Sequence, residues 1–326
     1  MRKLGVSKGV WAAAGLGAAA AGLGTMAAVG LRTAVLRRDR TEEHWEAKLN
    51  SREWCGRREE MRADMAWYAR QPKEEVSIVS RDGLRLRGKY LEAPDAVACV
   101  LLFHGFRSRG EFDFSMVLPM FYDTHISTLL VDQRSHGRSE GKYIGYGILE
   151  RYDCQQWAWF LHTKLGGSLP IFLQGLSMGA STVMMASELP MPPSVRGIIA
   201  DCGYNSAWEE MRHCIHKWYH LPAFPFLHMT NLACQIVAGY DLKEVTAAQA
   251  LGHSRLPVLF VHGTGDDFVP ANMTAENFAA ATGEKRQILV EGAVHGESYL
   301  QEEDRCRREL LDFIHKYSEG YPPKRK

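Results

Sequence analysis

The sequence predicts an α/β fold with a mostly parallel sheet, and two observations lead to this prediction. First, a chain of 326 residues with 46% hydrophobic content can bury a large core, and its length suits one α/β domain that carries an insertion. Second, the chain contains several continuous apolar runs that are typical of buried strands. These runs lie at residues 97–103, 126–131, 171–174, 197–201 and 256–261.

The run at residues 171–174 leads directly into Gly175-Leu176-Ser177-Met178-Gly179, which has the form of a nucleophile elbow. A helix is expected at residues 180–188, so Ser177 would lie where a strand turns sharply into a helix. The flanking glycines remove the Cβ atoms that would collide in such a turn. The same pattern also arises by chance as a structural turn, so the prediction depends on its partners.

Two later loops supply the partners that a nucleophilic serine needs, in the chain order serine, acid, histidine. The strand at residues 256–261 leads into a loop with two candidate carboxylates, Asp266 and Asp267. A last strand, expected at residues 286–290, leads into a glycine-flanked loop that contains His295. Each residue alone would be an ordinary polar loop residue, but together with Ser177 they predict a catalytic triad.

Two backbone N–H groups are expected to bind the oxyanion that forms when the serine attacks. One belongs to Met178, the residue after the nucleophile. The other belongs to Phe106, which lies in the loop His104-Gly105-Phe106 after the strand at residues 97–103. His104 is expected to brace this loop and to take no part in the chemistry.

With these motifs the chain resembles the α/β-hydrolase superfamily, and within it the bacterial serine hydrolases grouped with serine aminopeptidase (S33)-like and acylglycerol lipase-like enzymes. The matching motifs include a further loop at residues 132–141, and they follow the family's order over about residues 75–317. In similar proteins the loop at 132–141 is structural, so His136 is not assigned to the site.

The resemblance implies an eight-stranded sheet with helices on both faces and a helical lid. It also implies Ser177 as the nucleophile, His295 as the base, and Asp266, not Asp267, as the residue that orients the base.

The lid is expected at residues 203–250, because the connection between two strands is far longer there than an ordinary loop. Its aromatic side chains would form an acyl pocket, and the candidates for substrate binding are Trp208, Trp218, Phe224 and Phe226. The sequence thus divides into a membrane anchor with basic flanks (1–40), a helical linker (41–74), a hydrolase core (75–202 and 251–318), the lid and a basic tail (319–326).

Residues 10–31 carry no charged side chain and, as a helix, would be long enough to span a bilayer. The basic start of the chain also suits a signal peptide, but the segment after residue 31 is basic and lacks a clean cleavage site. An uncleaved N-terminal anchor is therefore preferred, with secretion after cleavage as the alternative. Basic residues are about equally dense on both sides, so they do not orient the anchor.

Charge and motifs limit the possible partners. The net charge of +1 gives no general attraction to nucleic acid, and the chain has no Walker-type loop and no CxxC pair. His213, His216 and His220 in the lid have no acidic ligand in register, so neither a metal nor another cofactor is expected.

The predicted function is a membrane-anchored serine hydrolase that cleaves a carboxylic ester or a similar acyl bond in a small molecule through an acyl-enzyme. An aminopeptidase-like or thioesterase-like hydrolase is the alternative, and a noncatalytic binding protein that reuses the fold is the second alternative.

Overall fold

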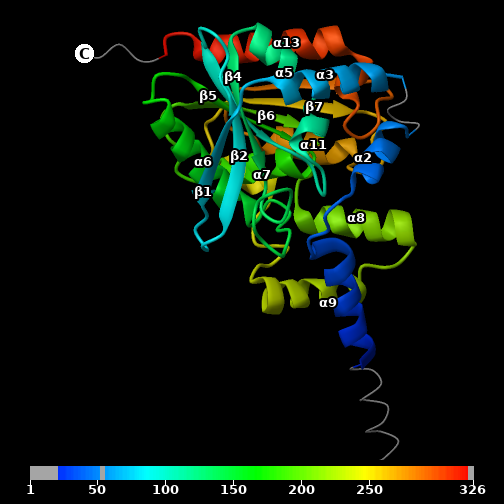
Figure 1. The fold of residues 1–326 in the computed structure, drawn as a ribbon. Coiled ribbons are helices and arrows are strands. Elements are labelled where there is room, and N and C mark those ends of the chain that lie inside the picture. The colour runs from blue at the N-terminus through cyan, green and yellow to red at the C-terminus, as the bar shows by residue number, and fades with distance from the viewer. Residues whose placement is uncertain (1–20, 52–55, 322–326) are drawn as a thin grey trace, which may run out of the picture.

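The computed structural model describes residues 21–51 and 56–321, and its centre is one eight-stranded sheet (Figure 1). The strand order is β1-β2-β4-β3-β5-β6-β7-β8. Strand β2 pairs antiparallel with β1 and β4, and every other neighbouring pair is parallel. The predicted mostly parallel eight-stranded sheet is confirmed. The strands are β1 (Glu74–Val79), β2 (Arg85–Leu91), β3 (Ala98–Phe103), β4 (Ile126–Asp132), β5 (Ile171–Leu176), β6 (Val195–Asp201), β7 (Val258–Gly263) and β8 (Lys285–Val290).

Helices cover both faces of the sheet (Figure 1). Helices α3, α5 and α13 pack on one face, and α6, α7, α10 and α11 pack on the other. Alternate residues of β3 point to opposite faces, so Val100 contacts the first group and Leu101 the second. This double coverage explains why the central strands are continuous apolar runs. The helices named here are α3 (Arg58–Arg70), α5 (Leu118–Asp123), α6 (Glu150–Lys164), α7 (Met178–Ala186), α10 (Ala247–His253), α11 (Ala271–Ala280) and α13 (Glu303–Ser318).

Shorter helices complete the core and its N-terminal approach. Helix α2 packs its buried Trp45 against Met61 of α3 and Phe112 of α4, so the predicted linker is helical and lies on the core. These elements are α2 (Glu42–Leu49), α4 (Gly110–Asp113) and α12 (Ser298–Gln301).

The lid consists of two helices and a π-helical turn after β6, at the end of the molecule where the N-terminal helix also lies (Figure 1). A side-chain cap begins α8, because the Ser206 hydroxyl accepts a hydrogen bond from the backbone N–H of Glu209 at 3.1 Å. The lid elements are α8 (Ala207–Tyr219), α9 (Phe226–Ala233) and η2 (Cys234–Ala238).

The N-terminal segment is helical at residues 21–30 and continues as the π-helical turn η1 (Leu31–Val35). It then pairs with the core, where Leu36 forms a β-bridge with Tyr143. The Arg107 guanidinium donates hydrogen bonds to the carbonyl oxygens of Thr33 (2.8 Å) and Leu36 (2.9 Å). The end of the predicted anchor is therefore attached to the domain by backbone as well as side-chain contacts.

Within residues 21–51 and 56–321, no helix combines the length and the hydropathy that crossing a membrane requires. Residues 10–20 of the predicted span lie outside the described residues.

Helix α7 begins in very close contact with the end of β3. A Cβ atom on Gly179 would lie 1.9 Å from the carbonyl oxygen of Phe103, and one on Gly175 would lie 2.1 Å from the carbonyl carbon of Gly179. Both obstacles are backbone atoms, which cannot rotate away as a flexible side chain can. Strand β5, helix α7 and strand β3 therefore meet only because these two residues are glycines.

Replacing Gly179 by alanine should lower the free energy of unfolding by about 2–3 kcal/mol, since the new methyl group overpacks a rigid contact. Denaturant-induced unfolding of the purified protein measures this change. The matched control is Gly252→Ala on the exposed side of α10, where a Cβ would have the Ala280 oxygen at 3.8 Å as its nearest neighbour. The control should be neutral or slightly stabilising, and equal losses in the two variants would contradict the interpretation.

Candidate active site

Ser177 lies at the tip of a sharp turn between β5 and α7, as the elbow motif predicts. Its backbone has φ 56° and ψ −118°, a region that residues with a side chain rarely adopt. The Ser177 N–H donates to the Asp201 carbonyl oxygen at 2.8 Å, which ties the turn to the neighbouring strand β6. This conformation directs the hydroxyl away from the sheet and toward the loops beyond the strand ends.

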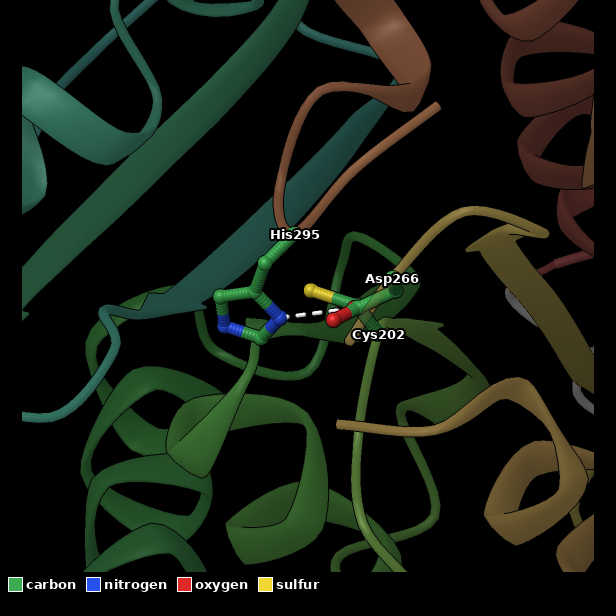
Figure 2. A group of neighbouring side chains, drawn as sticks. All are labelled: Cys202, Asp266 and His295. Carbon is green, nitrogen blue, oxygen red and sulfur yellow. Dashed lines mark hydrogen bonds and ion pairs between the residues drawn. The ribbon is translucent and has the colours of Figure 1, made fainter. Parts of the chain in front are cut away.

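A continuous chain of hydrogen bonds joins Asp266, His295 and Ser177. Atom Nδ1 of His295 is 2.7 Å from Asp266 Oδ2 (Figure 2), and Nε2 of His295 is 2.9 Å from Ser177 Oγ. The three residues follow β7, β8 and β5, which run parallel, so their carboxyl ends meet at one edge of the sheet. A carboxylate can only accept, so Nδ1 carries the proton and Nε2 is left to accept the serine hydroxyl.

The environment of Asp266 stabilises its charged form. Burial alone would raise the pKa of this carboxyl group, but hydrogen bonds with His262 and His295 hold the pKa well below its usual range. The backbone N–H groups of Phe268 and Val269 also donate to Oδ1, at 3.0 and 2.9 Å. Asp266 is therefore an ionised hydrogen-bond acceptor, and contacts to both of its carboxylate oxygens hold it in position.

Of the two candidate carboxylates, only Asp266 contacts His295. The Asp267 side chain is 61% exposed and forms an ion pair with Lys217 of the lid, with 3.2 Å between Nζ and Oδ2. The sharp turn at this point sends the two neighbouring side chains in opposite directions.

His262 is a neighbour of the site to which the sequence analysis gave no role. Its ring is fully buried, with Nε2 2.9 Å from the Val269 carbonyl oxygen and 3.2 Å from Asp266 Oδ2. Its Nδ1 is 2.6 Å from the Thr274 hydroxyl. The sequence does contain a sign of this role, because His262 begins the loop motif that also contains Asp266.

The two backbone N–H groups expected to bind an oxyanion lie on either side of Ser177. Met178 is the first residue of α7, so its N–H has no partner within the helix. Phe106 lies in the turn after β3, next to Gly105, where an added Cβ would be 3.5 Å from the Ser177 Cβ. Asp113 fixes this turn by accepting the Gly105 N–H at 2.7 Å.

His104 and His136 hold the same turn through backbone contacts. His104 Nδ1 donates to the Gly105 carbonyl oxygen at 2.8 Å, and its Nε2 accepts the Gln133 N–H at 3.1 Å. His136 Nε2 accepts the Arg107 N–H at 2.9 Å. Burial holds the pKa of His136 well below its usual value, so this ring is neutral and available as an acceptor.

Two hollows meet at Ser177. An apolar cavity of about 410 Å³ extends from Ser177 between the core and the lid. A second, more polar hollow of about 560 Å³ lies on the His295 side and is lined by Lys48 and Asp267 among others. The two hollows therefore suit a substrate that has an apolar part on one side of the serine and a more polar part on the other.

The predicted lid residues divide into two pairs. Trp218 and Phe226 line the apolar cavity. Trp208 lies outside it, because its ring packs under Lys243 (Nζ 3.8 Å from the ring centroid). Phe224 also lies outside, with 70% of its surface exposed.

The N-terminal segment forms part of the cavity wall, which the sequence analysis did not anticipate. Val29, Gly30, Thr33 and Ala34 line the cavity together with residues of the lid helices. The contact is close, because a Cβ on Gly30 would lie 1.9 Å from the Thr230 hydroxyl oxygen. The sequence around residue 30 does not predict a contact with residue 230, because this contact forms only when distant segments of the chain pack together.

Comparisons with known proteins agree with this architecture. The solved esterase Pf2001 of Pyrococcus furiosus superposes with a TM-score of 0.61 at 17% identity, over 78% of this chain and 94% of that one. The α/β hydrolase GrgF of a Penicillium species superposes with a TM-score of 0.55 at 18% identity, over 76% of this chain and 99% of that one. The chain has the α/β-hydrolase fold.

Sequence comparison gives distant relatives. The uncharacterized protein YqkD of Bacillus subtilis is 25% identical over 247 residues, which cover 76% of this chain and 81% of that protein. No family model matches the chain. The name of this relative gives no activity, so the sequence similarity does not indicate a substrate.

Cys202, Asp266 and His295 bring potential metal-ligand atoms within 4.8 Å of one another (Figure 2). A thiolate is the form of cysteine that binds metal, but burial raises the pKa of Cys202 well above its usual value. Asp266 and His295 are already bonded to each other. These three side chains are thus better described as the hydrogen-bonded pair Asp266–His295 beside the neutral thiol of Cys202 than as a set of metal ligands.

Replacing Asp266 by asparagine should lower the free energy of unfolding by about 2 kcal/mol near pH 7. The carboxylate has a lower pKa in the folded chain than in the unfolded chain, so its contribution is complete above the unfolded pKa of about 4 and is lost as the pH falls. The difference between wild type and variant should therefore be constant from about pH 7 to pH 5 and shrink below about pH 4, as measured by denaturant unfolding at pH 7 and pH 3.

Asp267→Asn is the matched control, because it removes an exposed carboxylate from the adjacent position. Its effect should stay below about 0.5 kcal/mol at both pH values. If the two variants show the same pH dependence, the hydrogen bonds of Asp266 do not have the stabilising role derived above.

Proposed function

We propose that this protein is a serine hydrolase that cleaves a carboxylic ester. The observation that carries the proposal is the hydrogen-bonded chain Asp266–His295–Ser177, which ends at a strained elbow serine beside an apolar cavity. The esterase activity in the name of the Pyrococcus furiosus neighbour is consistent with it.

In the first half of the proposed reaction, Ser177 Oγ attacks the ester carbonyl carbon and its proton moves to His295 Nε2. The negative charge of Asp266 stabilises the imidazolium that results. The carbonyl oxygen becomes an oxyanion and accepts hydrogen bonds from the N–H groups of Phe106 and Met178. The N-terminal end of α7 points at the same position and favours the negative charge.

Collapse of the tetrahedral intermediate breaks the bond to the alcohol, which takes the proton from His295 and leaves an acyl-Ser177 ester. Water then gives a proton to His295 and attacks the acyl carbonyl, and the acid is released as the proton returns to Ser177. The apolar cavity suits the acyl group, and the polar hollow on the His295 side suits the alcohol.

The aminopeptidase-like and thioesterase-like alternatives use the same serine chemistry and differ in the bond that is cleaved. A panel of p-nitrophenyl acyl esters, acyl thioesters and aminoacyl anilides separates them by kcat/KM. The apolar cavity favours esters with an extended acyl chain over aminoacyl amides.

A fluorophosphonate probe should label the wild-type protein covalently, and Ser177→Ala should abolish the labelling. Hydrolysis of a p-nitrophenyl acyl ester should fall at least about 10⁴-fold in the same variant, because the nucleophile is removed. Gel fluorescence and a spectrophotometric assay measure the two effects.

Ser181→Ala is the control, since this buried serine lies on the same helix one turn after Ser177 and bonds to the Tyr204 carbonyl oxygen at 3.0 Å. It should leave labelling intact. Failure of the folded wild type to react with the probe would sink the hydrolase proposal and favour a noncatalytic binding protein.

We also propose that the lid end of the molecule contacts a lipid surface, with the N-terminal segment as its attachment. Large apolar side chains are exposed there on the N-terminal helix, on α8 and around α9, which lie together (Figure 1). They include Val29 (44%), Trp218 (50%), Phe224 (70%) and Ile236 (75%). Exposed apolar side chains gathered around the wall of an apolar cavity suit a substrate that is drawn from lipid.

The double variant Phe224→Ser/Ile236→Ser should bind phosphatidylcholine–phosphatidylglycerol vesicles roughly tenfold more weakly than wild type, because two exposed apolar contacts with lipid are lost. Co-sedimentation of the full chain with vesicles measures the change. Val79→Ser is the control, since Val79 is 63% exposed on the edge strand β1, which four strands separate from β6, the strand that leads into the lid. Equal binding by all three proteins would contradict the proposed surface.

A further inference from the structure

Glu210 is a buried carboxyl group in the wall of the apolar cavity, and the proposed mechanism gives it no role. It lies on the first turns of α8 and is only 3% exposed. It lines the same cavity as Ser177, together with apolar lid residues such as Met211 and Ile215. A carboxyl group is an expensive side chain to bury among apolar neighbours unless its polar atoms are paired.

The pairing of Glu210 is incomplete. Its Oε1 accepts a hydrogen bond from the Cys214 thiol, with 3.2 Å between Sγ and Oε1. Its Oε2 is buried and has no hydrogen-bond partner among the residues that the structure describes. A residue of the cavity wall therefore carries one polar atom without a partner, and leaving such an atom unpaired is unfavourable.

The surroundings of Glu210 keep it neutral. No ion pair joins it to a lysine, arginine or histidine in the described part of the chain. Burial raises the pKa of Glu210 to about 8, and the negative charge of Asp266 adds to this effect. Near pH 7 the side chain is thus a carboxylic acid, which both donates and accepts a hydrogen bond.

We propose that Glu210 forms a polar subsite for the acyl group of the substrate, which hydrogen-bonds an oxygen atom carried on an otherwise apolar acyl chain. The preferred substrates are then esters of hydroxyacyl or oxoacyl groups, in place of esters of plain fatty acids. This inference rests on the proposed esterase function, because it assigns the acyl group to the cavity that Ser177 opens on.

A hydroxyl group fits this subsite in a way that a methylene group does not. A plain alkyl chain would cover Oε2 and leave it unpaired, whereas a hydroxyl replaces the missing partner. The preference for a hydroxylated acyl chain arises from the unpaired Oε2 of Glu210, so it should disappear when this carboxyl group is removed.

The test compares p-nitrophenyl alkanoates with p-nitrophenyl hydroxyalkanoates of the same chain length. In the second set, the hydroxyl group is moved stepwise along the acyl chain. Wild type should favour one hydroxylated position by about 10–100-fold in kcat/KM, mainly through KM. Glu210→Leu should lose this preference while still cleaving the plain ester, and Glu210→Gln should keep part of it because the amide still donates and accepts.

Glu209→Leu is the matched control, since Glu209 is the adjacent residue but pairs with Arg212 on the outer side of α8. It should leave the preference unchanged. The inference is overturned if wild type and Glu210→Leu show the same ratio of kcat/KM between hydroxylated and plain esters. It is also overturned if wild type prefers aminoacyl esters, because that preference would indicate a site for an ammonium group. Absence of any ester cleavage by folded wild type would instead overturn the proposed function, and the subsite with it.

Discussion

The site depends on one backbone contact, the close approach of strand β5, helix α7 and strand β3 at Gly175 and Gly179. Only residues without a Cβ allow the three elements to meet, and this contact forces the positive φ of Ser177. The strained turn directs the hydroxyl toward the loops after β7 and β8 and points the start of α7 at the same place. Packing of the core thus supports a conformation that the local sequence alone would not favour.

Around this contact, polar side chains hold the neighbouring loops through specific contacts. Asp113 and His136 fix the turn that contains Phe106, and His262 lies against Asp266. Asp113 and His136 accept backbone N–H groups, and His262 contacts another buried side chain, so all three keep loops beside the triad in place.

The cavity is assembled from three distant parts of the chain: the N-terminal segment, the core and the lid. Thr33 is held to Arg107 of the core, and Gly30 touches Thr230 of α9. The N-terminal segment therefore contributes to the cavity wall as well as packing against the core and the lid. Glu210 adds to that wall a buried carboxyl group with one oxygen that has no hydrogen-bond partner among the described residues.

The sequence by itself determined the order of strands and motifs, because buried strands are continuous apolar runs and an elbow needs its glycines at fixed spacing. It therefore predicted the sheet and brought Ser177, Asp266 and His295 together as candidates. Only the tertiary structure decided which neighbouring side chains point inward, since this depends on packing between segments far apart in the chain. It separated Trp218 from Trp208, and it placed Thr33, His262 and Glu210 around the site.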